Sequence, residues 1–85
     1  MISYRLSNHA IKQIGDREIP IELLEQVLTT PDQVLPQDDN SRVYQSKIVG
    51  EKNKTYLLRV FVSDSIQPFV VISLYLTSKI TKYWE

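Results

Sequence analysis

The sequence predicts an α+β fold in which two N-terminal helices pack on one face of a twisted antiparallel sheet of about four strands. Apolar residues recur with a helical period up to Pro31 and with an extended pattern from Arg42 onward. The extended half holds three segments rich in Val, Ile, Tyr and Phe, separated by turn-like stretches. A chain of 85 residues suffices for one small core, so we expect a single domain over residues 1–85.

The first helix is expected to begin after Ser7 and to end at Gly15. Ser7 is a good N-cap, and Leu6 before it can pack against Ile11. Helical spacing places apolar and polar side chains on opposite faces, so we expect His9 to be exposed or to face a cleft. The apolar face carries Ala10, Ile11 and Ile14, and the polar face carries His9, Gln13 and Asp16.

The second helix is expected to start with Pro20 at its first position and to stop at Pro31. Its broad apolar face consists of Leu23, Leu24, Val27 and Leu28. A short extended piece around Val34 and Leu35 and a polar loop over residues 37–40 should follow.

Three strands are expected to form an antiparallel meander, and residues 3–6 could add an edge strand. The last two are apolar on both faces, as central strands covered on both sides would be. The three strands span Arg42 to Val49, Thr55 to Ser63 and Phe69 to Thr77.

Charge is balanced overall but segregated along the chain. Residues 1–40 hold three basic and seven acidic side chains, whereas residues 41–85 hold seven basic and three acidic ones. The zero net charge counts against a global field for nucleic acid, but a local basic face stays open. An acidic helical layer over a sheet with a basic rim is the simpler interpretation.

Composition disfavours several classes of protein. The chain has no cysteine, and its longest apolar run, Phe69 to Leu76, is too short to span a membrane. No glycine-rich phosphate loop, zinc-binding histidine pair or serine-hydrolase set is recognisable, so we expect no metal and no cofactor. The start of the chain does not resemble a secretion signal, and a cytoplasmic location is expected.

Four residues are candidates for catalysis: His9, Arg17, Arg59 and Tyr75. A neutral imidazole at a helix start can act as a base, although a solvated histidine would look the same. Arg17 could hold a phosphate or form a surface ion pair. Arg59 interrupts an apolar strand, where it could clamp a phosphate or extend its charged end to the rim.

The C-terminal segment alternates basic and aromatic residues in a way that suits RNA, because ammonium groups meet phosphates while rings stack on unpaired bases. Lys79, Lys82 and Tyr83 are the candidates for substrate binding, and they share a face if the segment is helical. Plain packing competes with this interpretation, and we favour packing for Trp84.

The pattern as a whole resembles a small bacterial family called domain of unknown function 4258. The resemblance rests on a histidine-alanine pair at a helix start, an arginine before an isoleucine, and a late Tyr, Thr, Ser, Lys series. These map onto His9 and Ala10, onto Arg17 and Ile19, and onto Tyr75, Thr77, Ser78 and Lys79. That family looks related to RelE-like and barnase-like ribonuclease folds, which occur as toxins of toxin-antitoxin systems.

The resemblance implies a metal-independent RNA endonuclease. A base takes the 2′-hydroxyl proton, the 2′-oxygen attacks the adjacent phosphate, and cations stabilise the transition state. His9 would be the leading acid or base, with Arg17 and Arg59 holding the phosphate. RNA and a small cognate antitoxin protein are the implied partners, and homo-oligomer formation stays open. The neutral charge balance departs from the basic character usual in such toxins.

The rival hypothesis is a non-catalytic protein-interaction module on the same scaffold, because a shared fold does not guarantee chemistry. Catalysis requires His9, Arg17 and Arg59 to converge on one point in a cleft, whereas a binding module leaves them scattered.

Overall fold

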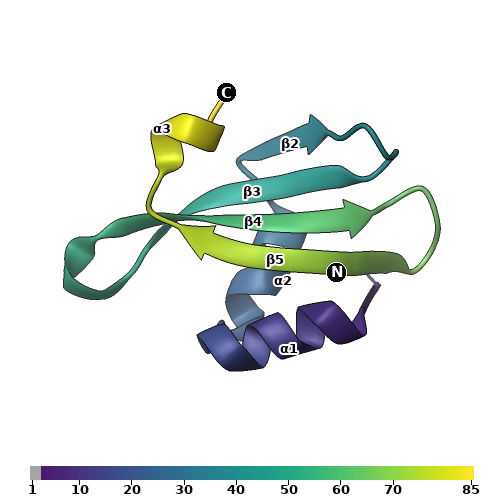
Figure 1. Cartoon of the computed structure of the whole chain (residues 1–85), viewed down its shortest axis with the longest axis horizontal. Coiled ribbons are helices and arrows are strands. Elements are labelled where there is room, and N and C mark those ends of the chain that lie inside the picture. Colours follow the sequence, from purple (N-terminus) through teal and green to yellow (C-terminus); the bar gives the residue numbers. More distant parts are fainter. Residues whose placement is uncertain (1–2) are drawn as a thin grey trace.

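A five-stranded mixed sheet forms the centre of the computed structural model, which describes residues 3–85 (Figure 1). Its strand order is β1-β5-β4-β3-β2, with β1 parallel to β5 and every other pair antiparallel. The predicted α+β class and the bounds of the last three strands are confirmed. The strands are β1 (Tyr4–Leu6), β2 (Gln33–Pro36), β3 (Arg42–Val49), β4 (Thr55–Ser63) and β5 (Phe69–Thr77).

The expected sheet of about four antiparallel strands was wrong in two respects. The short extended piece around Val34 pairs with β3 over four residues and becomes the fifth strand. The edge strand β1 runs parallel to its neighbour. Tight turns fix antiparallel pairing between consecutive strands, but β1 and β5 are separated by most of the chain, which supplies the long connection that parallel pairing needs.

Helix α1 (Asn8–Arg17) starts as predicted, because the Ser7 hydroxyl accepts a hydrogen bond from the Ala10 N–H at 3.0 Å. The helix does not stop at Gly15. Its C-cap is Glu18, which adopts the left-handed conformation with φ 51° and bonds back to Gly15 O. The predicted faces also need correction, since Ile11 is exposed while Gln13 Oε1 accepts the Leu74 N–H at 2.9 Å.

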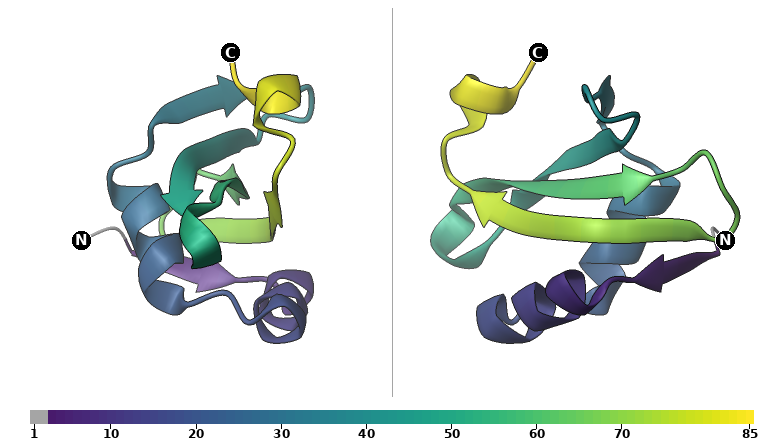
Figure 2. Two further views of the ribbon diagram at one scale, coloured as in Figure 1. Left: turned by 90° about the vertical axis from the view of Figure 1, so that its left-hand side faces the viewer. Right: turned by 45° about the vertical axis from the view of Figure 1, so that its right-hand side comes forward.

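Helix α2 (Ile21–Thr29) lies beside α1 on the same side of the sheet, as both views in Figure 2 show. Pro20 is its N-cap rather than its first helical residue. The two helices bury apolar side chains against one sheet face, and each fully buried Leu or Val contributes roughly 1.5–3 kcal/mol. The fully buried members of this core include Ala10, Leu24, Val27, Leu28, Leu58, Val60, Val62, Val71 and Leu74.

The opposite sheet face is covered only at one end, by the short helix α3 (Ile80–Tyr83) and the residues after it (Figure 1). The chain reaches this side of the sheet after β5. The connection between β3 and β4 contains a short turn, η1 (Glu51–Asn53). Among residues 3–85, no helix is long and apolar enough to cross a membrane. The polar residues that form the candidate site lie on this face, under the C-terminal segment.

Candidate functional site

Four polar residues stand in one row across four neighbouring strands. Gln33 pairs with Gln45, Gln45 with Arg59, and Arg59 with Tyr75. We call this row the polar ladder. Side chains alternate between the two faces of a strand, and Leu58 and Val60 on either side of Arg59 face the two N-terminal helices. The polar ladder therefore lies on the opposite face, under α3.

The guanidinium of Arg59 is the centre of the polar ladder. Arg59 is only 8% exposed. Its Nε donates to Gln45 Oε1 and its Nη1 to the Tyr75 hydroxyl, both at 2.9 Å. Its carbon Cζ lies 4.3 Å from the centre of the Tyr83 ring. Neutral acceptors and an aromatic face thus stabilise the buried cation without cancelling its charge.

The third guanidinium nitrogen, Nη2, is left for an outside partner. Among residues 3–85 it makes no hydrogen bond, and no fully buried side-chain nitrogen or oxygen in that range lacks one, so Nη2 reaches solvent. The ion pairs in the described part of the chain join Lys12 to Asp16 and Arg42 to Asp64, and neither involves Arg59. A nearly buried cation without a carboxylate partner attracts anions.

A depression of about 300 Å³ opens over this guanidinium. Strand β2 and the loop after it form one wall, and the C-terminal segment forms the other. The depression therefore offers a guanidinium, an ammonium and a phenol at one place, together with the carboxylate of Glu85. Its lining residues are Leu35, Pro36, Gln37, Arg59, Lys82, Tyr83 and Glu85.

The surroundings of the Tyr83 phenol favour loss of its proton. The Tyr75 side chain, as a hydrogen-bonding neighbour, and then the positive charge of Lys82 lower the pKa of Tyr83, and Arg59 adds to the effect. The Tyr75 and Tyr83 rings meet edge to face with centres 6.2 Å apart. Because the Tyr75 oxygen already accepts from Arg59, its own hydroxyl hydrogen is available to a second partner.

Aromatic rings extend the site along the sheet. The rings of Phe61 and Tyr75 are nearly parallel, with centres 6.0 Å apart. On the other side of the polar ladder, the ammonium of Lys47 lies 4.1 Å from the centre of the Trp84 ring. Flat rings beside cations suit a ligand that has both aromatic and anionic parts.

The structure does not bring all the predicted site residues together. His9 and Arg17 are exposed on α1, which packs on the far side of the sheet from Arg59. Arg59, Tyr75 and Tyr83 meet at the polar ladder, and Lys82 lines the same depression. Lys79 is the exposed N-cap of α3 and is not among the residues lining the depression.

Sequence reasoning missed Gln33 and Gln45. Gln45 is fully buried, and its amide joins Arg59 to Gln33. One signal was available, because a tight turn centred on Lys52 places Gln45 opposite Arg59. A buried arginine needs acceptors, and a glutamine directly across from it supplies one.

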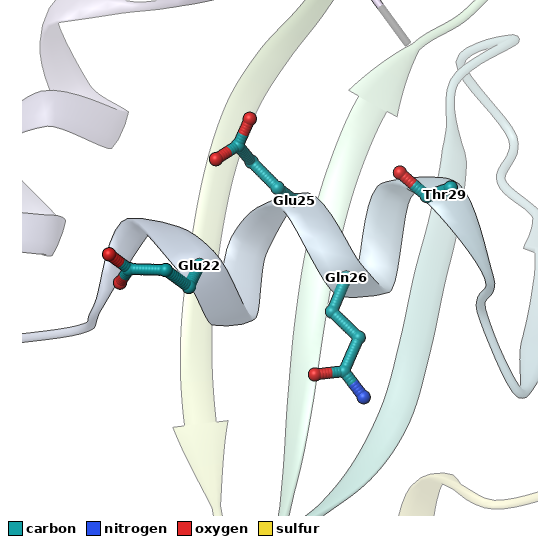
Figure 3. Close-up of a pocket in the computed structure, with 4 residues that line it drawn as sticks. All are labelled: Glu22, Glu25, Gln26 and Thr29. Carbon is teal, nitrogen blue, oxygen red and sulfur yellow. The ribbon is translucent and has the colours of Figure 1, made fainter. Parts of the chain in front are cut away.

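A second depression, of about 330 Å³, lies on the other side of the molecule along α2 (Figure 3). It is lined by Glu22, Glu25, Gln26 and Thr29, so its rim carries two carboxylates. Such a surface repels phosphate. Within residues 3–85, no group of three or more His, Asp or Glu side chains is placed to hold a metal ion.

These observations define an α+β protein with a cationic, tyrosine-lined site on the sheet face opposite α1 and α2. The chain belongs to the family described as domain of unknown function (DUF4258), whose model matches residues 6–76. The match includes Arg59 and Tyr75 and ends before the segment that carries Lys82 and Tyr83. The comparison with curated proteins found no match, and neither did the comparison with solved structures.

Proposed function

We propose that this protein is a metal-independent RNA endonuclease whose reaction takes place in the depression over the polar ladder. The observation that carries the proposal is the Arg59 side chain, which is nearly buried, is held by neutral groups and lines the depression. A phosphodiester is the anion that the surrounding cations and rings fit best. The resemblance to RelE-like and barnase-like ribonucleases supports the same reaction class.

The proposed reaction uses groups of this chain alone. The Tyr83 phenolate accepts the proton of a ribose 2′-hydroxyl, and the 2′-oxygen then bonds to the adjacent phosphorus. Arg59 and Lys82 stabilise the negative charge on the phosphorane. The bond from phosphorus to the 5′-oxygen breaks, and that oxygen takes the Tyr75 hydroxyl proton. Tyr83 returns a proton to Tyr75, leaving a 2′,3′-cyclic phosphate and a 5′-hydroxyl.

His9 and Arg17 do not converge with Arg59, because the sheet separates them from the polar ladder, so the catalytic arrangement expected for these three residues is not formed. The scheme therefore gives His9 and Arg17 no part in bond making. Tyr83 takes the role of base in place of His9 because it lines the depression beside Arg59 and Lys82. The reaction consumes no oxidant, reductant or water.

The test is cleavage of a labelled RNA oligonucleotide in the presence of a chelator. We expect Tyr83→Phe and Arg59→Lys each to lower kcat/KM by about 10²–10³-fold, as the loss of a base or of a transition-state contact does. Tyr56→Phe removes a tyrosine hydroxyl away from the polar ladder, and His9→Ala removes the imidazole; both should retain activity. Full activity in Arg59→Lys, or products ending in a 3′-hydroxyl, would contradict the proposal.

A second candidate function, a protein-interaction module, is favoured by the depression along α2. Its carboxylates at Glu22 and Glu25 suit a partner segment with basic side chains. A small cognate antitoxin protein is one partner of this kind. A short protein encoded beside this chain should then lose binding to Glu22→Lys and Glu25→Lys while RNA cleavage is unchanged. Binding that survives both substitutions excludes this surface.

A further inference from the structure

The segment Tyr83–Glu85 is tied to the sheet by glutamine side chains. Gln45 Nε2 donates to the Tyr83 carbonyl at 3.2 Å. Gln33 Nε2 donates to the Glu85 carbonyl at 2.6 Å, and Gln33 Oε1 accepts the Glu85 N–H at 3.3 Å. Gln33 thereby bonds both backbone groups of Glu85, much as a neighbouring strand would.

Contacts within α3 itself contribute little to holding the segment in place. Helix α3 has four residues, no side-chain cap and no buried residue. The backbone bonds from the N–H groups of Lys82 and Trp84 go to Lys79 and Ile80, within the segment itself. Such a short helix is not stable alone. The two glutamines therefore place the segment together with the contacts of Tyr83 with Arg59 and Tyr75 and the stacking of Lys47 on Trp84.

The Arg59 guanidinium fixes which way the Gln45 amide is oriented. A guanidinium can only donate, so it must face the oxygen of the Gln45 amide. The Gln45 nitrogen must then face away, where it finds Gln33 Oε1 at 2.8 Å and the Tyr83 carbonyl. One amide thus couples the cation of the site to the segment that carries Tyr83.

We infer that Gln45 and Gln33 form a latch that holds the C-terminal segment closed over Arg59, with Gln45 as the positioning residue that sets Tyr83 against the guanidinium. The latch itself follows from the contacts above. Its effect on RNA cleavage rests on the proposed function. When the latch is broken, the segment swings away from β2, and Tyr83 and Lys82 leave the depression.

The chain contains one tryptophan, Trp84, so intrinsic fluorescence reports directly on the segment. We would compare acrylamide quenching of Trp84 in the natural chain, Gln45→Met and Gln33→Met. Methionine retains the length of glutamine and removes its hydrogen bonds. Gln26→Met, on the exposed side of α2, is the matched control.

We expect either latch variant to enlarge the detached population about tenfold, because each loses at least one amide hydrogen bond to the segment. Trp84 should then be quenched more readily, and the pKa of the Tyr83 phenol, followed by NMR of labelled tyrosine rings, should rise toward its ordinary value. Gln26→Met should match the natural chain in both measurements. Quenching and Tyr83 titration unchanged in the latch variants would overturn the inference.

The experiments distinguish failure of the latch from failure of the proposed RNA cleavage. Altered quenching in the variants of a chain that cleaves no RNA would keep the latch and remove the proposed function. In an active chain, Gln45→Met should lower kcat more than it raises KM, because the substrate phosphate still meets Arg59 while Tyr83 is displaced. Should Gln45→Met fail to fold, as thermal unfolding would reveal, the half-buried Gln33→Met decides the question by the same measurements.

Discussion

The single residue Arg59 shows how a charged side chain is buried in a sheet without a carboxylate partner. Its strand neighbours Leu58 and Val60 are fully buried, so the guanidinium must be satisfied where the backbone places it. The Gln45 amide and the Tyr75 hydroxyl each supply a hydrogen bond to a charged group, worth roughly 1.5–3 kcal/mol. Neither supplies a negative charge. The residue is thus stable without a counter-ion and still able to bind one.

Tyr44, on the opposite sheet face, should make the stability of the protein depend on pH. Its hydroxyl donates to Asp64 Oδ2 at 2.8 Å. Burial first, and then this hydrogen bond, raises the pKa of Tyr44 to about 12. The unfolded chain releases the same proton near pH 10, so the free energy of unfolding should fall as pH rises from about 10 toward 12.

Urea denaturation at several pH values between about 9 and 11 measures this loss. Tyr44→Phe has no phenol to titrate, so its free energy of unfolding should fall less steeply over the same range, by an amount that approaches the equivalent of one proton at the upper end. Other groups titrate in both chains and cancel in the comparison. Equal slopes in the two chains would contradict the raised pKa.

At the scale of elements, the bounds of β3, β4 and β5 were predictable because β-branched and aromatic residues fill them and turn residues separate them. The start of α1 was predictable from Ser7. The end of α1 was wrongly predicted at Gly15. A glycine ends a helix where the backbone adopts the left-handed conformation, and in this chain the residue with that conformation is Glu18.

The rest of the sheet and the site depend on pairing between distant segments. A turn centred on Lys52 fixes the register of β3 and β4. A β-bulge between Phe61 and Val62 shifts the register of β4 and β5, so the meeting of Arg59 with Tyr75 is not readable from turn length alone. Similarly, the extended piece that became β2 was expected, but its four residues do not show which strand they pair with.

Gly15→Ala tests the corrected extent of α1. Gly15 sits inside the helix, and a Cβ added there would meet nothing within 4 Å. We expect the substitution to raise the free energy of unfolding by about 1 kcal/mol, the difference in helix propensity between the two residues. Gly50→Ala is the contrasting change. Its Cβ would lie 2.8 Å from the Tyr56 ring, so this substitution should lower the free energy of unfolding. Chemical denaturation measures both, and a destabilised Gly15→Ala would place a helix end at Gly15 after all.

On the scale of the whole molecule, the charge segregation seen along the sequence becomes a difference between two faces. The layer of α1 and α2 carries Asp16, Glu22 and Glu25 against Lys12 and Arg17, and Lys12 is paired with Asp16 at 3.7 Å. The opposite side carries Arg59, Lys47 and the lysines of the C-terminal segment, with Glu85 as an acidic side chain beside them. Zero net charge is therefore compatible with a cationic surface on one side, which a polyanion would approach from that side.

This asymmetry predicts how salt affects RNA binding. Each ammonium that contacts a single-stranded phosphate contributes about 0.7 to the slope of log affinity against log salt concentration. Lys82 lines the depression over the polar ladder, so Lys82→Gln should reduce the magnitude of that slope by about this amount. Lys12→Gln removes an equal charge from the α1 face and should leave the slope unchanged. Fluorescence anisotropy with a labelled oligonucleotide across a salt series measures both, and equal reductions in the two variants would mean that RNA does not distinguish the faces.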